Sequence, residues 1–272
     1  MKTYVINLPK DSERKVFQEK QLQNLNIDYE IINAVSTNDI SKQTYKKHKN
    51  DWQRPLRDVE VACYYSHQIL WREIIKEEEP ALILEDDALL SKCMPNILKE
   101  LASLQNIDYI NLEVVGRKKI VSRKAQMLSS CDTKLYRLYL DRNGTGGYIL
   151  FPSGAKKLLA LEAKSGIGLS DAHINACTDL IAYQIEPASV IQLDQCTQYG
   201  ITPPLDIKSN IGTQKKPTVN LKERWLFVPK RLKAQLKQGI QHLFSILKAE
   251  KREIKIRHED FVSTYSKEQE NG

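Results

Sequence analysis

Short apolar runs alternate with longer amphipathic segments along the first part of the chain. An apolar run bounded by turn residues is typical of a buried strand. Such runs predict strands at residues 4–8, 29–35, 81–84, 109–112, 135–140 and 148–151. A helical pattern separates the first two runs, and this β-α-β order predicts parallel strands with a right-handed crossover.

Helices are predicted between the strands. Ser12, Asp58 and Ser153 are suited to start three of them, because Ser and Asp are favoured N-caps. The second of these helices extends to about Glu79, and Pro80 ends it; another helix is expected around residues 95–104. Residues 36–57 are predicted as a loop or irregular helices, and residues 116–133 as basic and irregular. The alternation predicts an α/β class protein, an α/β/α sandwich with a mostly parallel sheet.

The C-terminal part of the chain has a different pattern. Residues 200–220 are rich in Pro, Gly and Asn and are predicted as a linker. A helical stripe follows, formed by Leu232, Leu236, Ile240, Leu243 and Leu247 and flanked by Lys230, Arg231, Lys233, Lys237 and Lys248. We therefore expect a main domain over residues 1–215 and a linker with a basic amphipathic helical tail over residues 216–272. Such a helix either lies at a membrane interface or packs on the body or on a second subunit.

Charge is concentrated in this tail. The whole chain carries +7, whereas residues 222–258 hold eleven Lys or Arg against three acids, which gives +8 and leaves −1 for the rest. A basic tail on a near-neutral body favours an anionic membrane surface as partner. Nucleic-acid binding is the alternative, but no RNP, helix-turn-helix or zinc-finger pattern supports it.

Five widely spaced cysteines without a CxxC pair predict neither a disulfide framework nor a zinc site. The N-terminal apolar run is too short for a signal peptide, and no stretch has the length of a transmembrane helix. These features predict a cytoplasmic protein that is peripheral at the inner membrane.

The strongest chemical signal is Glu85-Asp86-Asp87, which directly follows the apolar run at residues 81–84. Adjacent carboxylates repel one another unless a cation neutralises them. Ligands of open α/β sheets bind beyond the carboxyl ends of strands. The motif therefore predicts a divalent-metal and phosphate site. A solvated loop, or the first turn of the next helix, is the alternative.

Several separated motifs resemble glycosyltransferase family 25, the bacterial lipooligosaccharide glycosyltransferases. They are Val5-Ile6-Asn7-Leu8 with Arg14, Ile31 to Val35, Val59 to His67, Ile83 to Leu90, Asn111-Leu112-Glu113, Gly144 to Ile149, Asp171 and Ile191-Gln192. The resemblance implies a GT-A type, Rossmann-like fold over residues 1–215, a UDP-sugar donor, Mn²⁺ or Mg²⁺, and transfer with inversion to a lipooligosaccharide core sugar. The chain departs from the family at Gly146, where relatives often carry Ala, and at Asn143, where an aromatic residue can occur.

The resemblance and the strand geometry together nominate metal and donor residues. On a strand, Glu85 and Asp87 share a face, so Asp87 is the first choice as metal ligand and Glu85 its partner. Asp86 points away, but it stays a candidate because a turn breaks the alternation; Glu85 or Asp86 would contact the ribose or a metal-bound water. The residues expected to bind the nucleotide sugar are Asn7, Arg14, Ser66, His67, Glu85, Asp86, Thr145, Gly146 and Gln192.

Inverting transfer needs a general base for the acceptor hydroxyl. Asp171 is the candidate and Glu113 the rival, because it too ends a predicted strand; a helix N-cap is the alternative role for Asp171. His173 is a further possible metal ligand, and Gln192 a possible acceptor contact. We expect a galactosyl- or glucosyltransferase, with a nucleic-acid-binding protein or an inactive scaffold relative as alternatives.

Overall fold

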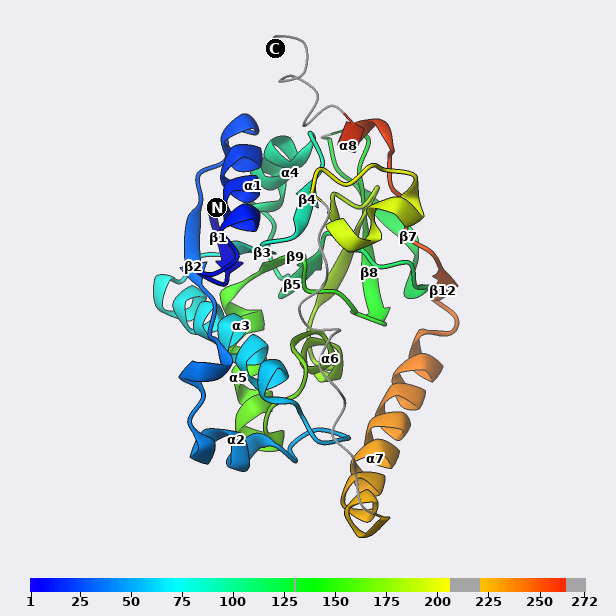
Figure 1. Cartoon of the computed structure of the whole chain (residues 1–272). Coiled ribbons are helices and arrows are strands. Elements are labelled where there is room, and N and C mark those ends of the chain that lie inside the picture. Colours follow the sequence, from blue (N-terminus) through cyan, green and yellow to red (C-terminus); the bar gives the residue numbers. More distant parts are fainter. Residues whose placement is uncertain (130, 206–220, 263–272) are drawn as a thin grey trace.

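The computed structural model describes residues 1–129, 131–205 and 221–262 and consists of a large sheet with helices on both faces (Figure 1). The sheet has nine strands in the order β12-β7-β8-β10-β5-β9-β3-β1-β2. Their bounds are β1 Lys2–Asn7, β2 Glu30–Asn33, β3 Ala81–Glu85, β5 Tyr109–Asn111, β7 Lys119–Met127, β8 Lys134–Leu140, β9 Gly147–Leu150, β10 Ala182–Glu186 and β12 Ala249–Arg252. The α/β class is therefore confirmed.

Two hydrophobic cores lie on opposite faces of the sheet because successive strand side chains alternate. Val5 and Leu82 join one core, with side chains of α1 (Ser12–Asn24) and α4 (Met94–Leu101). Tyr4 and Ile83 join the other, with side chains of α3 (Asp58–Glu77) and α5 (Pro152–Ser165). The central strands are covered on both sides, and this explains why they are continuous apolar runs in the sequence.

The large sheet is mixed, whereas the sequence predicted a mostly parallel sheet. Strand β1 pairs parallel with β2 and β3, and β5 pairs parallel with β10. Strand β9 lies between β3 and β5 and runs antiparallel to both, while β8 is antiparallel to β7 and β10. The connection between β7 and β8 is short, and a short connection joins antiparallel strands only. Strand β7 lies in the segment predicted as irregular, and that prediction is wrong. Only the first four residues of β7 are buried, so the strand is not marked by a long apolar run.

The acidic motif lies between two sheets. Glu85 ends β3, while Asp86 and Asp87 form a tight turn into β4 (Ala88–Leu90). Strand β4 belongs to a small second sheet with β6 (Glu113–Val114) and β11 (Val190–Gln192). The motif is therefore held by strands on both sides and is neither a solvated loop nor the first turn of a helix.

The helix starts differ slightly from the predictions. The N-cap of α3 is Arg57, which forms a capping box with Glu60, and Asp58 is the first helical residue. Ser12 is likewise the first residue of α1, and α5 begins at Pro152, one residue before Ser153. Residues 36–57 contain η1 (Thr37–Asp39) and α2 (Lys42–His48), as expected for irregular helices.

The C-terminal segment returns to the sheet. Helix α7 (Leu221–Ser245) is followed by β12, which pairs antiparallel with β7, and by α8 (Glu259–Val262). In Figure 1, α7 extends below the sheet and beside α6 (Ser170–Ala176). Residues 206–220 of the expected linker lie outside the described residues, and the division at residue 215 stays a prediction. No described helix combines the length and the apolar character needed to cross a bilayer.

Candidate active site

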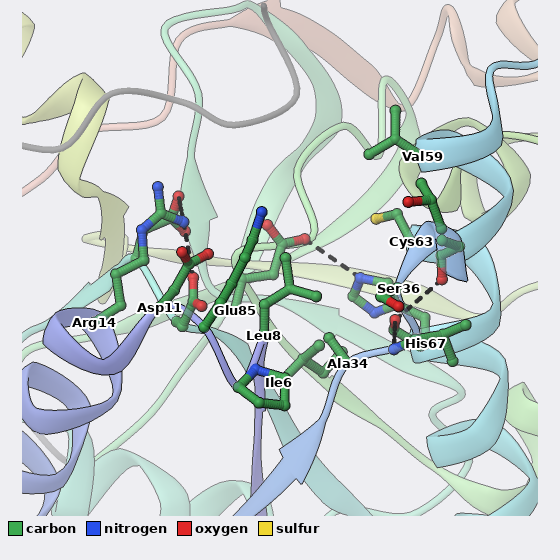
Figure 2. A pocket seen from close by; sticks show the side chains of 18 of the residues that line it. Ile6, Leu8, Asp11, Arg14, Ala34, Ser36, Val59, Cys63, His67 and Glu85 are labelled. Carbon is green, nitrogen blue, oxygen red and sulfur yellow. Dashed lines mark hydrogen bonds and ion pairs between the residues drawn. The ribbon is translucent and has the colours of Figure 1, made fainter. Parts of the chain in front are cut away.

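A cavity of about 510 Å³ opens at the carboxyl ends of β1, β2 and β3. Its walls come from the β1–α1 loop, the β2–η1 loop, α3 and the acidic turn. Figure 2 shows Arg14 on one side of this first cavity and His67 on the other, with Glu85 between them. A second cavity of about 470 Å³ adjoins it and shares Cys63 and Glu85 with it. Two compartments therefore meet at Glu85.

Asp86 is held by two side chains that were predicted to bind the donor. Asn7 Nδ2 donates to Asp86 Oδ2 over 2.8 Å, and Arg14 Nη1 donates to Oδ1 over 2.9 Å. Gln18, a residue that the sequence did not point to, donates to the Asp86 backbone carbonyl. Burial raises the pKa of Asp86, while Arg14 and Asn7 oppose the rise. The structure thus brings Asn7, Arg14 and Asp86 together, with their side chains engaged with one another.

Glu85 receives contacts from three elements. Thr145 Oγ1 donates to Oε1 over 2.5 Å, Gln192 Nε2 donates to Oε2 over 3.2 Å, and His67 Nε2 lies 3.3 Å from Oε1. Burial raises the pKa of Glu85, but the contacts with His67 and Thr145 outweigh it and leave the pKa below its usual value. Glu85 therefore stays ionised at neutral pH.

Asp87 has the opposite environment. Its Oδ1 is buried without a hydrogen-bond partner among the described residues, and Arg14 Nη1 is 3.7 Å from Oδ2. Burial, followed by the negative charges of Glu85 and Asp86, raises the pKa of Asp87 to about 8. A carboxylate that lacks donors and sits beside other carboxylates suits a hard divalent cation. The described residues hold no group of three or more His, Cys, Asp or Glu arranged for a metal, so a cation would take one or two protein ligands.

Glu113 lies behind the glycine-rich loop that precedes β9. It is fully buried, its Oε2 accepts from the Gly146 backbone N–H over 2.8 Å, and its Oε1 has no partner among the described residues. Burial and the charge of Glu85 place the pKa of Glu113 well above its usual value. A Cβ at position 146 would lie 3.1 Å from Glu113 Cδ and 2.8 Å from Gln192 Cγ, which explains the glycine there. Glu113 is not among the residues that line either cavity.

Ser66 and His67 are both committed to protein contacts. Ser66 Oγ accepts from the Val35 backbone N–H over 2.9 Å and donates to the Ala62 carbonyl, so it fastens the end of β2 to α3. His67 is 1% exposed, and its Nδ1 is 2.9 Å from Tyr148 Oη while its Nε2 faces Glu85. Both side chains therefore organise the wall of the first cavity.

Asp171 lies in the second cavity, in the first turn of α6, whose N-cap is Leu169. Its Oδ1 accepts from the Ala172 backbone N–H, and burial raises its pKa. The cap alternative for Asp171 is therefore wrong. His173 points to the core instead, where its Nε2 contacts the Leu158 carbonyl over 3.1 Å and Tyr64 Oη over 3.3 Å. The structure thus separates His173 from the carboxylates with which it was predicted to bind a metal.

Two buried residues near the site were given no role by the sequence analysis. Tyr148 connects His67 to the core, and its place directly after the glycine-rich loop was the available signal. Lys119 Nζ donates to the Glu113 carbonyl over 3.1 Å and to Gln184 Oε1 over 2.6 Å, and burial lowers the pKa of Lys119 to about 7. Nothing in the sequence pattern distinguishes Lys119 from the exposed basic residues around it.

Known proteins resemble this chain over most of the site. Residues 1–172 match glycosyltransferase family 25 (LPS biosynthesis protein). The lipooligosaccharide biosynthesis protein lic2B of Haemophilus influenzae is 26% identical over 239 residues, which cover 81% of this chain and 85% of that protein. Procollagen galactosyltransferase 2 of Homo sapiens is 25% identical over 170 residues, 57% of this chain but only 27% of that enzyme.

A solved glycosyltransferase involved in the glycosylation of the major capsid of PBCV-1 overlaps 60% of this chain and 66% of that one, at 12% identity and a TM-score of 0.32. That similarity is too low to assign a fold type. The family match covers residues 1–172, which include β1, β3 with the acidic turn, the glycine-rich loop and Asp171. On this basis the chain belongs to glycosyltransferase family 25.

Proposed function

We propose that this glycosyltransferase moves a hexose, galactose or glucose, from a UDP-sugar to a lipooligosaccharide core sugar, with inversion and with help from Mn²⁺ or Mg²⁺. The observation that carries the proposal is the under-compensated carboxylate of Asp87, placed beside two cavities that meet at Glu85. Likeness to lic2B supports the acceptor class. A GT-A type fold is part of the proposal, and the crossover from β1 to parallel β2 and the acidic end of β3 are consistent with it.

The first cavity is the proposed donor site. Its volume of about 510 Å³ lies within the range usual for small-molecule sites. The β1–α1 and β2–η1 loops would surround the nucleoside, and the acidic turn would face the diphosphate. Asp87 would hold the cation, because its Oδ1 has no hydrogen-bond partner among the described residues and the approach of Arg14 to Oδ2 does not offset burial and the charges of Glu85 and Asp86. A bound cation supplies neutralisation of the charge that develops on the departing diphosphate.

The second cavity is the proposed acceptor site. Asp171 lines it, and a carboxylate with a raised pKa is a better proton acceptor than an ordinary one. The acceptor oxygen would attack the anomeric carbon as the bond from that carbon to the phosphate oxygen breaks, and its proton would pass to Asp171. A single displacement of this kind inverts the anomeric carbon. Glu113 is the weaker candidate because it lies behind the glycine-rich loop.

Equilibrium binding tests the donor assignment. Titration of the protein with UDP-galactose, UDP-glucose and UDP-N-acetylglucosamine, each with and without Mn²⁺, is expected to show metal-dependent binding of one hexose donor. The Asp171→Asn variant is expected to keep that binding and to lose transfer, and NMR of the wild-type product is expected to show inversion. Binding of none of the three donors, or a retained anomeric configuration, would contradict the proposal.

Helix α7 supports the proposed location on an anionic inner-leaflet membrane. Most of its described large apolar side chains face solvent, with Phe244 81% and Leu236 67% exposed, whereas Phe227 is buried. Lys230, Arg231 and Lys237 instead donate to backbone carbonyls of the body, so α7 is fastened by its basic side. An apolar ridge turned outward and bordered by cations suits the surface of a negatively charged bilayer.

Sedimentation with liposomes tests this location. Vesicles that contain anionic lipid are expected to pull down the wild type, and Leu236→Asp with Leu243→Asp to abolish the effect without changing turnover of a soluble acceptor. Val16→Asp is the matched control, because Val16 is a half-exposed apolar residue on α1. Equal pull-down of all three proteins would refute the membrane role. A salt-sensitive shift of RNA without liposome binding would favour the nucleic-acid alternative.

A further inference from the structure

A buried chain of polar contacts runs from the core to Glu85. Trp71 Nε1 donates to Tyr148 Oη over 3.0 Å, Tyr148 Oη is 2.9 Å from His67 Nδ1, and His67 Nε2 is 3.3 Å from Glu85 Oε1. Trp71 and Tyr148 are fully buried. The chain connects α3 and β9 to the end of β3, at the point where the two cavities meet.

The direction of these hydrogen bonds follows from the chemistry of the groups. An indole N–H only donates, so Tyr148 Oη is the acceptor for Trp71. Burial lowers the pKa of His67, but its contacts with Tyr148, Cys63 and Glu85 outweigh burial and raise the pKa above its usual value. A protonated ring donates from Nδ1 to Tyr148 Oη, whereas a neutral ring with its hydrogen on Nε2 accepts the Tyr148 hydroxyl hydrogen at Nδ1. In both forms Nε2 carries a hydrogen and faces Glu85.

The Glu85 carboxylate consequently uses most, but not all, of its hydrogen-bond acceptor positions. An ionised carboxylate has about four acceptor positions. Oε1 is used by Thr145 and His67, and Oε2 is used by Gln192. One position on Oε2 is left, and Glu85 lines both cavities.

We propose that Tyr148 and His67 are positioning residues, which fix the Glu85 carboxylate so that Oε2 accepts a hydroxyl of the transferred hexose where the two cavities meet. This inference rests on the proposed function, because it assumes a sugar bound at that junction. It makes Glu85 a determinant of which hexose is accepted, since epimers place one hydroxyl differently. It also separates Glu85, as the sugar contact, from Asp87, as the cation ligand.

Calorimetric binding of UDP and of UDP-hexose, both with Mn²⁺ and without acceptor, distinguishes these roles. Glu85→Gln is expected to weaken UDP-hexose binding about tenfold or more and to leave UDP binding unchanged. Tyr148→Phe is expected to act in the same direction by roughly five- to tenfold. Tyr109→Phe is the control, because Tyr109 is a fully buried tyrosine whose ring centroid is 5.4 Å from that of Tyr148 and whose hydroxyl accepts from Asn111 Nδ2. It is expected to leave both affinities unchanged.

Two substitutions at His67 keep the test decisive should Tyr148→Phe unfold the protein. Gln places an amide N–H near the position of Nε2, whereas Asn places its amide near Nδ1. His67→Gln is therefore expected to retain the selective binding of UDP-hexose over UDP, and His67→Asn to lose it. Equal behaviour of the two variants, or a parallel loss of UDP and UDP-hexose binding, would overturn the positioning role. If the wild type binds no UDP-hexose at all, the proposed function itself fails, and that outcome is distinct from selective binding that survives Glu85→Gln.

Discussion

Replacement of Asp87 by Asn should stabilise the metal-free protein. The side chain is 18% exposed, its Oδ1 has no partner among the described residues, and its pKa in the folded state is about 8, against 3.8 for an ordinary aspartate. The folded state therefore holds a proton that the unfolded state releases. Between pH 3.8 and pH 7 each pH unit lowers the free energy of unfolding by about 1.4 kcal/mol. The penalty at pH 7 approaches ~4 kcal/mol, and relaxation around the site would reduce it.

The upward shift of the Asp87 pKa predicts how the stability of the protein changes with pH. Because the folded-state pKa of Asp87 is raised, the metal-free wild type is expected to lose stability as pH rises from about 4 towards 8. Asp87→Asn lacks the titrating group and should lose this component, so the variant should gain most over the wild type near pH 8. Asp28→Asn, which changes an exposed aspartate, is the control and should follow the wild type.

Urea unfolding monitored by tryptophan fluorescence at pH 5, 7 and 8, in the presence of EDTA, measures the effect. Addition of Mn²⁺ with UDP is then expected to raise the unfolding midpoint of the wild type and not that of Asp87→Asn, and the variant should lose transfer. A variant no more stable than the wild type at pH 8 would refute the claim that Arg14 compensates the Asp87 charge only in part. Metal-dependent turnover by the variant would refute its assignment as cation ligand.

Two further substitutions probe the frame of the site. Glu60 accepts from Arg54 and Arg57, and although burial opposes them these contacts lower the pKa of Glu60 to about 2, so Glu60→Gln should cost roughly 3 kcal/mol at pH 7. Because the folded-state pKa of Glu60 is depressed, the difference in urea midpoint between wild type and variant should shrink as pH falls from 4.5 towards 2. A difference that persists at the lowest pH would show that the ion pairs of Glu60 are not its cause. Gly146→Ala should push Gln192 away from Glu85, since the new Cβ would lie 2.8 Å from Gln192 Cγ. A drop in melting temperature worth about 1–3 kcal/mol, with weaker donor binding, is expected, and an unchanged protein would show that the loop shifts freely.

Sequence patterns predicted six of the nine strands of the large sheet and missed β7, β10 and β12. Continuous apolar runs marked β1, β3 and β9, because both sides of these strands are buried. Strand β7 alternates less clearly, and its second half is exposed and basic, so it was predicted as irregular. Strand direction was the other failure. Which strand β9 pairs with depends on long-range packing, and an apolar run carries no information about direction.

The acidic centre of the site was predictable, but its partners were not. Three carboxylates after an apolar run indicate a ligand site from local sequence alone. The bond between Asn7 and Asp86 joins residues 79 positions apart, and that between Gln192 and Glu85 joins residues 107 apart. Only the arrangement of strands in the sheet brings such pairs together. For the same reason the sequence could place His67 among the residues that bind the nucleotide sugar but could not show that its two nitrogens face Tyr148 and Glu85.

The buried carboxylates discussed above differ in how many hydrogen-bond donors they contact. Asp108 accepts from Ser153, Lys157 and the Ile181 backbone N–H, and although burial opposes these donors they lower its pKa, as happens at Glu60. These are structural groups, because their charge stabilises the fold. The Asp87 Oδ1 has no hydrogen-bond donor among the described residues and Arg14 lies 3.7 Å from Oδ2, so the charge of Asp87 destabilises the fold until a further cation neutralises it. Buried charges that oppose folding are typical of ligand-binding sites. The difference in donors between Asp108 and Asp87 is therefore the physical argument for locating cation binding at the end of β3.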